Sequence, residues 1–515
     1  MPQNGIYSFQ ISGIILTKGG SAMIELGSRK ECLFDSALLD PSGTSASFRL
    51  HAPVYRGTVM VHDAPWEGNG CDYHNFFFDP DWKGVRGDHP EGMYRMYYLG
   101  WWMPNGNNDS QKTGGIRVCY AESADGLSWE KPSLGLAEFK GSRENNLLFS
   151  PDEPNDFDNF MVFRDTCPAC LPEERYKAVA SWNGGESGKP SVLRAYYSAD
   201  GIRFRLGPVL TSAGNFDSLN VAFYDEYAGM YRVYFRGFHE IPSGDLNAGV
   251  RDIRTMVSPD FQNWSEPALL DFRGAPDYAL YTNCVLPCPG APHILIGFPT
   301  RYMERQAWSK NFDELTGAEA RKMRMTLHPR YGLTVTDCVF MVSRDGKSFK
   351  RYEDALIVPG PENGLNWIYG DAYPARGILT APSPMPGAPD EFSLLIPANH
   401  WSDKPAVLDR YGIRQDGFVS LRGPMEGASM LTLPFTYTGE DLVVNFSTSA
   451  RGSILFRLIS DEGVFESEET FGDALERRVR FPDDGTVASL SGKPVRLEAV
   501  LRDADLYSFT FRSGF

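Results

Sequence analysis

The sequence has few cysteines and no long apolar run. Eight cysteines in 515 residues are too few and too scattered for a disulfide-stapled scaffold. Cys167-x-x-Cys170 and Cys284-x-x-x-Cys288 could be drawn as two halves of a zinc site, but the spacings differ and each pair lies beside proline. We therefore expect neither a metal nor another cofactor, and no disulfide. No window reaches the length of a membrane-spanning helix, so we expect no membrane association.

Positive charge is also in deficit, with 50 basic residues against 66 acidic ones and a formal net charge of −16. This balance argues against nucleic acid or an anionic membrane as a partner and suits a neutral or cationic ligand, although ordinary solubility explains it equally well. The first twenty residues have no basic start, no apolar stretch of signal-peptide length and no small-residue cleavage site. We therefore expect a cytoplasmic protein.

Helical periodicity is nearly absent. The best segment runs from Asp313 to Met325, where apolar residues alternate with charges, and it predicts a short helix inserted between larger β elements. The content of 42% hydrophobic and 13% aromatic residues is that of a globular chain with more than one packed domain. The fold class predicted is therefore all-β.

A short phrase, Ser-x-Asp-Gly-x-x-aromatic, recurs along the chain after β-rich runs. Clear copies centre on Asp125, Asp200, Asp260 (without the glycine) and Asp345, and a degenerate copy on Asp416. A strand, an Asp-Gly turn and an aromatic plug are typical of a β-propeller blade, because glycine takes the φ > 0 position and the aromatic side chain packs between sheets. Five copies predict five four-stranded blades.

A second repeat fixes the phase of the blades. Phe77-Phe78-Asp79, Phe163-Arg164-Asp165 and Phe223-Tyr224-Asp225 each end a strand in an acidic turn and precede a second strongly β-forming strand. Three domains follow from these patterns: an N-terminal extension packed on the propeller (1–50), a five-bladed β-propeller (51–423) and a β-sandwich (424–515), whose strands alternate in hydrophobicity.

Several motifs resemble those of known enzymes. The motifs are Pro65-Trp66-Glu67, Tyr120-Ala121-Glu122-Ser123, Phe216-Asp217-Ser218, Leu280-Tyr281-Thr282-Asn283 and Gly297-Phe298-Pro299-Thr300-Arg301-Tyr302. With the predicted layout, they resemble the furanosidase superfamily of glycoside hydrolases, families 32, 43, 62 and 68, and most closely a set of family 32-like bacterial proteins. Neither the Asn-Asp-Pro-Asn motif nor the Glu-Cys-Pro motif of family 32 is present, and only Arg164-Asp165 is similar to its Arg-Asp-Pro.

In such a propeller the first residues of each innermost strand ring a central funnel, so acids just before those strands converge. Glycoside hydrolysis needs such carboxylates as acid and as base or nucleophile. The upstream acids are Glu67 and Asp72, Asp156 and Asp158, Asp217, Asp277 and Asp371 in blades one to five. We predict Glu67, Asp158 and Asp217 as catalytic, with Asp217 the acid and Glu67 the nucleophile or base. Each could instead be a loop carboxylate that caps backbone amides.

Asp165 is a competitor for the catalytic set. The Arg-Asp resemblance implies a transition-state stabiliser, but the internal repeat pairs Asp165 with Asp79 and Asp225 at the far end of the strand. Three equivalent aspartates indicate turn chemistry, and we give this interpretation preference.

Other polar and aromatic groups suit ligand binding. We predict that these are Trp66, Asn220, Tyr281, Asn283, Arg301, Asp371 and His400. An inter-blade salt bridge for Arg301 and a core histidine at His400 are the structural alternatives.

The function predicted is an exo-acting glycoside hydrolase for a fructoside- or arabinoside-containing oligosaccharide, the substrate class that the resemblance implies. Two alternatives remain open. A non-catalytic carbohydrate-binding propeller would need no converging acids, and a glycoside phosphorylase would need a basic phosphate pocket, for which Arg251, Arg254 and Arg301 are available.

Overall fold

The computed structural model describes residues 14–16, 22–102, 115–149, 159–183, 191–241, 249–326, 328–364, 366–368, 370–402 and 404–514. The chain divides into two compact units. The propeller unit consists of Pro53–Pro287 and Leu295–Gly412, and the sandwich unit of Met1–Ala52, Cys288–Ile294 and Ile413–Phe515. No helix in the described part of the chain is long and apolar enough to span a membrane.

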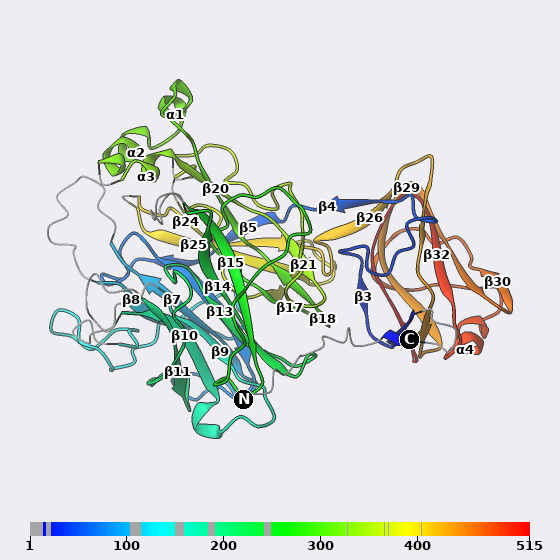
Figure 1. Cartoon of the computed structure of the whole chain (residues 1–515), viewed down its shortest axis with the longest axis horizontal. Coiled ribbons are helices and arrows are strands. Elements are labelled where there is room, and N and C mark those ends of the chain that lie inside the picture. Colours follow the sequence, from blue (N-terminus) through cyan, green and yellow to red (C-terminus); the bar gives the residue numbers. More distant parts are fainter. Residues whose placement is uncertain are drawn as a thin grey trace, which may run out of the picture. The chain divides into compact units, whose positions relative to one another are not determined.

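Among the described residues, five antiparallel sheets of three or four strands form the blades, which confirms the predicted five-bladed β-propeller (Figure 1). Blade 1 contains β6 (Asp72–Asp79), β7 (Met93–Gly100) and β8 (Arg117–Ser123). Blade 2 contains β9 (Met161–Arg164), β10 (Tyr176–Trp182), β11 (Val192–Ser198) and β12 (Arg205–Thr211). Blade 3 contains β13 (Val221–Asp225), β14 (Met230–His239), β15 (Val250–Ser258) and β16 (Ala268–Leu269). Blade 4 contains β17 (Leu286–Cys288), β18 (Ala291–Gly297), β21 (Met341–Ser343) and β22 (Lys350–Arg351).

Blade 5 closes the ring, because it combines the first strand of the propeller sequence with its last three strands. It contains β23 (Leu379–Ala381), β24 (Glu391–Ala398), β25 (Ala406–Ile413) and β5 (Val54–His62). The register of β25 against β5 runs from Ala406 opposite His62 to Gly412 opposite Val54. In blade 1 the fourth-strand position is held by a single bridge between Glu122 and Glu130.

Four of the repeated turns are the same structure. Each follows the third strand of its blade, and the aspartate Oδ1 accepts the backbone N–H groups two and three residues on at 2.7–2.9 Å. In the three glycine copies, the serine Oγ accepts the glycine N–H at 2.8–2.9 Å. The aspartates of these turns are Asp125, Asp200, Asp260 and Asp345. These carboxylates therefore serve local turn chemistry.

In two of these turns, those of Gly201 and Gly346, the glycine is matched by an arginine of the preceding blade, whereas Gly126 packs against Leu379. Arg95 Nη2 donates to the carbonyl of Asp200 at 2.8 Å, and a Cβ on Gly201 would lie 2.6 Å from Arg95 Nη1. In the third turn Phe261 holds the left-handed position, with φ of 61°, and the preceding blade has the shorter Lys177 at the position of Arg95. Phe261 is buried there against Tyr231, with ring centroids 5.1 Å apart. The missing glycine is thus compensated in the neighbouring blade.

The fifth turn differs from the other four. Asp416 follows β25, but the next strand, β26 (Val419–Gly423), belongs to the sandwich unit. Its carboxylate accepts hydrogen bonds from Lys30 Nζ at 2.7 Å and from Ser508 Oγ at 2.7 Å. Asp416 therefore shares its place after a third strand with the other copies but not their hydrogen bonding.

The second repeat is turn chemistry, as predicted. Asp79, Asp165 and Asp225 each accept a backbone N–H two or three residues on. Each also binds a cation of the next strand: Arg95, Lys177 and Arg232. Two of them tie blades together, because Tyr176 and Tyr231 of the following blade donate to Asp79 and Asp165 at 2.7 Å.

The helices lie in an insertion within blade 4, between β18 and β21, rather than between blades. It contains β19 (Thr300–Glu304), α1 (Lys310–Glu314), α2 (Ala318–Met325), α3 (Arg330–Leu333) and β20 (Thr334–Cys338). The three helices lie together near β20 (Figure 1). Arg321 of α2 holds the insertion in place, donating to the carbonyls of Gly332 at 2.7 Å and Thr334 at 3.0 Å.

The sandwich unit is rich in sheet, consistent with the predicted β-sandwich. An eight-stranded sheet contains β3 (Glu31–Cys32), β4 (Ser47–Leu50), β26, β27 (Ala428–Leu431), β29 (Asp441–Ser460), β30 (Gly463–Glu466), β31 (Asp473–Arg478) and β32 (Arg496–Arg512). A second sheet contains β1 (Ile14–Leu16), β2 (Ala22–Gly27) and β28 (Phe435–Tyr437), and α4 (Thr486–Leu490) completes the unit. Alternate residues of β32, such as Leu497, Ala499 and Leu501, are fully buried in its core.

The N-terminal segment differs from the prediction. Instead of extending the propeller, β2 pairs with β28, β3 with β32 and β4 with β26. β26 itself, which we had expected within the propeller range 51–423, pairs with β32. The sandwich unit is therefore built from both ends of the chain.

Candidate active site

The residues at the start of the inner strands converge, as the phase of the blades predicts. β6 begins at Asp72, while Asp217 lies just before β13, Tyr281 before β17 and Tyr373 before β23. Tyr73 Oη donates to Tyr281 Oη at 3.0 Å, and Tyr281 Oη donates to Asp217 Oδ1 at 3.3 Å. Blades 1, 3 and 4 thus meet through one chain of hydrogen bonds.

Tyrosine rings surround this chain. Tyr373 stacks against Tyr73, with ring centroids 6.5 Å apart, and against Tyr281, at 5.3 Å. Tyr302 of β19 stacks on Tyr281 at 5.7 Å. We call Tyr73, Tyr281, Tyr302 and Tyr373 the tyrosine cluster. Tyr281, Tyr302 and Tyr373 are only 3–7% exposed, because their ring faces pack on one another.

Asp217 is the exposed carboxylate of the site. Its side chain is 52% exposed, and Oδ2 lies 3.4 Å from Nη2 of the buried Arg236. Arg236 is held by the carbonyl of Asn215 at 3.2 Å and by its Oδ1 at 2.7 Å. The site therefore has a solvent-facing acid beside a fixed cation.

Asp72 has the opposite environment. It is 2% exposed, and burial raises its pKa well above the ordinary value, opposed only by a hydrogen bond from Tyr73 N–H to Oδ1 at 2.8 Å. Its Oδ2 lies 3.9 Å from His400 Nδ1, and burial, followed by the charge of Arg324, lowers the pKa of His400 to about 3. An uncharged histidine supplies no counter-ion, so Asp72 is held in its protonated form.

The backbone around the cluster is strained. Tyr73, Ala372 and Trp401 have φ of 54°, 58° and 57°, the left-handed region that such residues rarely adopt. Tyr73 and Trp401 belong to the aromatic packing, and Ala372 precedes Tyr373. Strain of this kind costs of order 1–3 kcal/mol per residue and persists at sites where the surroundings impose it.

Glu67 does not face this site, contrary to its predicted role. It is fully buried, and its Oε2 accepts Ala64 N–H and Lys131 Nζ, each at 2.8 Å, while Tyr98 Oη donates to Oε1 at 2.5 Å. Burial alone would raise its pKa, but the hydrogen bond and charge of His62 and then those of Lys131 bring it to about 2. A carboxylate with both oxygens occupied is structural here.

Three predicted ligand-binding residues are also used by the fold. Asn220 Nδ2 donates to the carbonyl of Phe216 at 2.9 Å, and Asn283 Oδ1 accepts Val285 N–H at 3.2 Å. Both asparagines are buried, and their amides tie neighbouring blades together. Trp66 Nε1 donates to Asn146 Oδ1 at 2.7 Å, and its ring packs on the core of blade 1.

Arg301 forms a salt bridge rather than a free cation. Its Nε and Nη2 donate to Asp337 at 2.8 and 2.5 Å, and Nη1 donates to the carbonyl of Glu353. The salt bridge joins the paired strands β19 and β20 of one insertion, so it is an inter-strand bridge and not the inter-blade bridge considered as the alternative.

Asp371 and His400 are both buried, so neither presents its side chain to solvent. Asp371 is 5% exposed, and burial raises its pKa to about 7 against hydrogen bonds from the Ile368 and Trp367 amides. His400 contacts Trp401 at 4.6 Å between ring centroids. Of the predicted residues, the structure brings together Asp217 and Tyr281, with His400 behind Asp72. Asp158 lies outside the described residues.

The residues that the sequence prediction missed are Tyr73, Arg236 and Tyr373. Asp72 was among the upstream acids but was passed over for Glu67. A register shift in the pairing of β6 with β7 between Asp72 and Asn75 turns Tyr73 out of the regular strand pattern. The adjacent Asp-Tyr pair at the start of an inner strand was the available signal.

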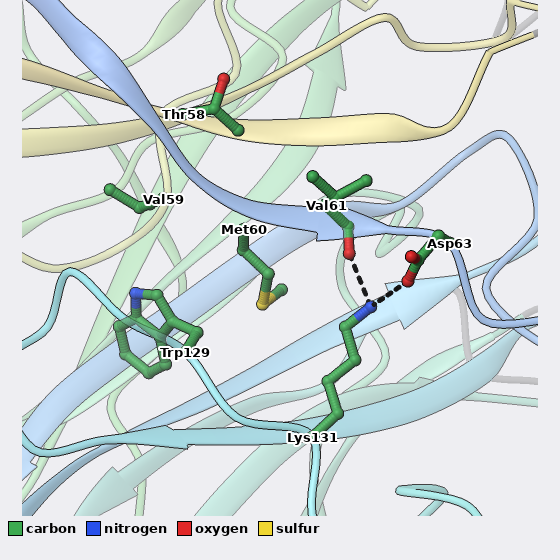
Figure 2. Close-up of a pocket in the computed structure, with 7 residues that line it drawn as sticks. All are labelled: Thr58, Val59, Met60, Val61, Asp63, Trp129 and Lys131. Carbon is green, nitrogen blue, oxygen red and sulfur yellow. Dashed lines mark hydrogen bonds and ion pairs between the residues drawn. The ribbon is translucent and has the colours of Figure 1, made fainter.

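Two cavities lie away from the tyrosine cluster. One, of about 530 Å³, is lined by β5 and by Trp129 and Lys131 (Figure 2). Lys131 points to Asp63 and the carbonyl of Val61 there, so its ammonium group is already occupied (Figure 2). A smaller cavity of about 210 Å³ is lined by His62, Asn69 and Lys404 among others. Neither presents two acids. No group of three metal-ligating side chains occurs in the described residues.

Comparison with known proteins gives similar folds at low identity. No family profile matches the sequence, and no curated protein sequence matches it. An N-acetylgalactosamine deacetylase from F. plautii is similar at 12% identity, with a TM-score of 0.42, covering 72% of this chain and 94% of that one. A family 32 β-fructofuranosidase from Bombyx mori is similar at 9% identity, with a TM-score of 0.40, covering 90% and 95%. An endo-arabinase from Bacteroides thetaiotaomicron is similar at 10% identity, with a TM-score of 0.36, covering 71% and 97%.

Proposed function

We propose that this chain is a glycoside hydrolase in which Asp72 is the general acid and Asp217 the base or nucleophile, the reverse of the acid role that the sequence predicts for Asp217. The observation that carries the proposal is the contrast of the two carboxyls around Tyr73. Burial and then the neighbouring groups Tyr281, Asp217 and Asp72 raise the pKa of Tyr73 well above its ordinary value. One carboxyl is buried without a counter-ion, and the other is exposed beside Arg236. Carboxyls whose environments push their protonation apart are what acid and base roles require.

The reaction follows from these states. Asp72 donates its proton to the glycosidic oxygen as the bond from that oxygen to the anomeric carbon breaks. If Asp217 is the nucleophile, it bonds to the anomeric carbon, and water then displaces it while giving a proton to Asp72. If Asp217 is the base, it takes a proton from the attacking water and later releases it to solvent, from which Asp72 is reprotonated. Among the described residues no donor lies within hydrogen-bond distance of Asp72 Oδ2, which leaves that oxygen for the substrate.

The substrate class is part of the proposal. The resemblance in sequence sets fructosides and arabinosides first, acted on from the end of a small oligosaccharide. A screen of aryl furanosides and pyranosides tests this order directly.

The decisive variants are Asp72→Asn and Asp217→Asn. General acid–base help is worth roughly two to four orders of magnitude, so each variant loses at least about a hundredfold in kcat. With a good aryl leaving group, which needs little protonation, Asp72→Asn recovers most of its rate and Asp217→Asn does not. The alkaline limb of the pH–rate profile, set by loss of the acid's proton, disappears in Asp72→Asn.

Asp277→Asn is the matched control. Asp277 is also exposed and binds His239 Nε2 at 2.9 Å, but it has no contact with the tyrosine cluster in the described residues. It should keep wild-type kcat within about twofold, as expected for an exposed ion pair. Equal losses in all three variants would refute the assignment of Asp72 and Asp217.

A carbohydrate-binding propeller without catalysis is the second candidate, because it would need no converging acids. It takes over if sugars bind and the wild type cleaves no glycoside in the screen. The phosphorylase alternative is weaker, since Arg301 is bound to Asp337 and Arg254 to Asp252.

A further inference from the structure

One cation of the site has no anion among the described residues. Arg251, at the start of β15, is 6% exposed, and its guanidinium lies over the ring of Tyr302, with Cζ 4.2 Å from the centroid. It also lies 5.9 Å from the ring centroid of Tyr281. Arg251 therefore reaches the tyrosine cluster from the side of blade 3.

Among the described residues no carboxylate oxygen lies within 4 Å of Arg251, and its buried Nε has no hydrogen-bond acceptor. The arginines around it differ. Arg236 has Asp217 and Asn215, and Arg254, three residues on, has both oxygens of Asp252 and the carbonyl of Phe238. Arg251 is thus the one arginine of these three without a polar partner in the part of the chain described.

A second buried polar group near Arg251 also lacks a partner in the described part of the chain. Tyr373 is 4% exposed, and its Oη has no hydrogen bond to any described residue. The charge of Arg251 acts on both Tyr373 and Tyr281. Buried polar groups are nearly always hydrogen-bonded, because leaving one without a partner costs folding free energy. A ligand that accepts hydrogen bonds from Arg251 and Tyr373 would remove this cost.

We propose that Arg251 binds an anionic group of the substrate: the carboxylate of a uronic acid, or a sulfate or phosphate ester on the sugar. The planar guanidinium fork suits two parallel hydrogen bonds to such an oxyanion. This inference rests on the proposed function only in calling the bound sugar a substrate, because the binding of an anion by Arg251 needs no catalysis. The net charge of −16 makes the acceptance of an anion dependent on this local cation.

The test measures binding without turnover. Calorimetry compares glucuronate, galacturonate, glucose 6-sulfate and glucose 6-phosphate with their neutral parent sugars. Wild type should bind at least one anionic sugar about tenfold more tightly than its parent, the scale of one charged hydrogen bond. Arg251→Gln should reduce that preference to within about twofold, and Arg251→Lys should retain only part of it.

Arg254→Gln is the matched control, because it removes an arginine of the same strand that already has its partners. It should keep the tenfold preference, and near-native circular dichroism of each variant excludes misfolding as the cause. A wild type without any preference, or an Arg251→Gln variant that keeps it, would overturn the proposal.

Inorganic phosphate separates two sources of the anion. If phosphate speeds the consumption of a neutral glycoside and yields a sugar phosphate, the anion is the attacking group, and the assignment to a sugar substituent is overturned. Failure of the glycosidase proposal looks different: anionic sugars still bind in an Arg251-dependent way while no glycoside is cleaved.

Discussion

Strand β6 has an aspartate at each end, and the two carboxylates have opposite environments. Asp79, at its last position, is bound by Arg95 at 3.2 Å, by Tyr176 at 2.7 Å and by the backbone of Asp81. Asp72, at its first position, has one backbone hydrogen bond and no cation among the residues that the structure describes. The difference is not one of burial, since both are nearly inaccessible.

The same division holds around the ring. At the turn end the acids repeat from blade to blade, and each repeat satisfies its carboxylate with its own amides and cations. At the funnel end the acids do not repeat, and buried groups that lack a partner among the described residues gather there instead. Repetition therefore marks architecture, and unsatisfied chemistry marks the place where a ligand is needed.

The largest loss of stability should come from removing the carboxylate of Asp79, which has all its partners. Asp79→Ala leaves the fully buried Arg95 without its carboxylate and should lower the free energy of unfolding by about 3–5 kcal/mol.

Asp72→Asn should behave differently. The pKa of Asp72 is raised by folding, so the folded state keeps its proton, and stability falls as pH rises above the unfolded value near 3.8. Urea unfolding at pH 4 and pH 8 should find Asp72→Asn equal to wild type at pH 4 and more stable at pH 8.

A pH titration sharpens the contrast with Glu67. The pKa of Glu67 falls from 4.5 to about 2 on folding, so its contribution is complete above pH 4.5 and is lost as pH falls toward 2. At 1.36 kcal/mol per pH unit this is about 3 kcal/mol. Because burial lowers the pKa of His62, Lys131 carries the charge that holds Glu67 at neutral pH.

Glu67→Gln should therefore lose stability at pH 7 by about this amount and converge on wild type near pH 2. Asp63→Asn is the control, since it removes the exposed partner of the same lysine, 3.4 Å away, and should change stability by less than about 0.5 kcal/mol. Parallel stability curves for Glu67→Gln and wild type across this range would contradict the structural role.

A smaller effect is expected in the repeated turns. Gly346 has φ of 78°, and a Cβ there would lie 2.1 Å from Arg232 Nη1. Gly346→Ala should cost about 2–3 kcal/mol, combining backbone strain with crowding. Gly229→Ala, at φ of 67° in open space, should show the strain alone, about 1 kcal/mol. If Arg232→Lys, which imitates blade 2, fails to recover part of the Gly346→Ala loss, the matching of turn and cation is wrong.

The smallest effect should be at an exposed pair of the same turn end. Arg203 lies 3.1 Å from Asp200, but its side chain is 71% exposed. Arg203→Ala should change the free energy of unfolding by no more than about 0.5 kcal/mol. The melting temperature should therefore change only slightly. A larger loss would mean that the turn end is stabilised by its surface as well as by its buried pairs.

Much of the fold was predictable because its signals are local. A turn that binds its own amides and a strand that alternates over a few residues carry their structure in a short window, and they fixed the five blades. Local periodicity also predicts a helix over Asp313 to Met325, of which α2 (Ala318–Met325) is the larger part, but not the break at Leu315 and Gly317 or the third helix, α3. The partners of β2, β3 and β4 could not be found this way, since they come from the other end of the chain.

The site was predictable in position more than in identity. The predicted starts of the inner strands led to Asp217 and Tyr281. They could not decide between Glu67 and Asp72, which are five residues apart. That choice depends on Lys131 and Tyr98, which satisfy Glu67 from other strands. Asn220 and Asn283 were misassigned for the same reason, because inter-blade amide bonds have no sequence pattern of their own.

The closure of blade 5 by β5 sets an order of events during synthesis. β5 leaves the ribosome before every other strand of the propeller, and its partner β25 leaves after all of them. Until then the edge of β5 is unpaired, and the loop that its pairing closes contains almost the whole propeller. Such a non-local step is slow compared with the folding of individual blades. The nascent chain must therefore protect this edge for most of its translation, and a chain that stops short of β25 is an aggregation-prone species rather than a smaller propeller.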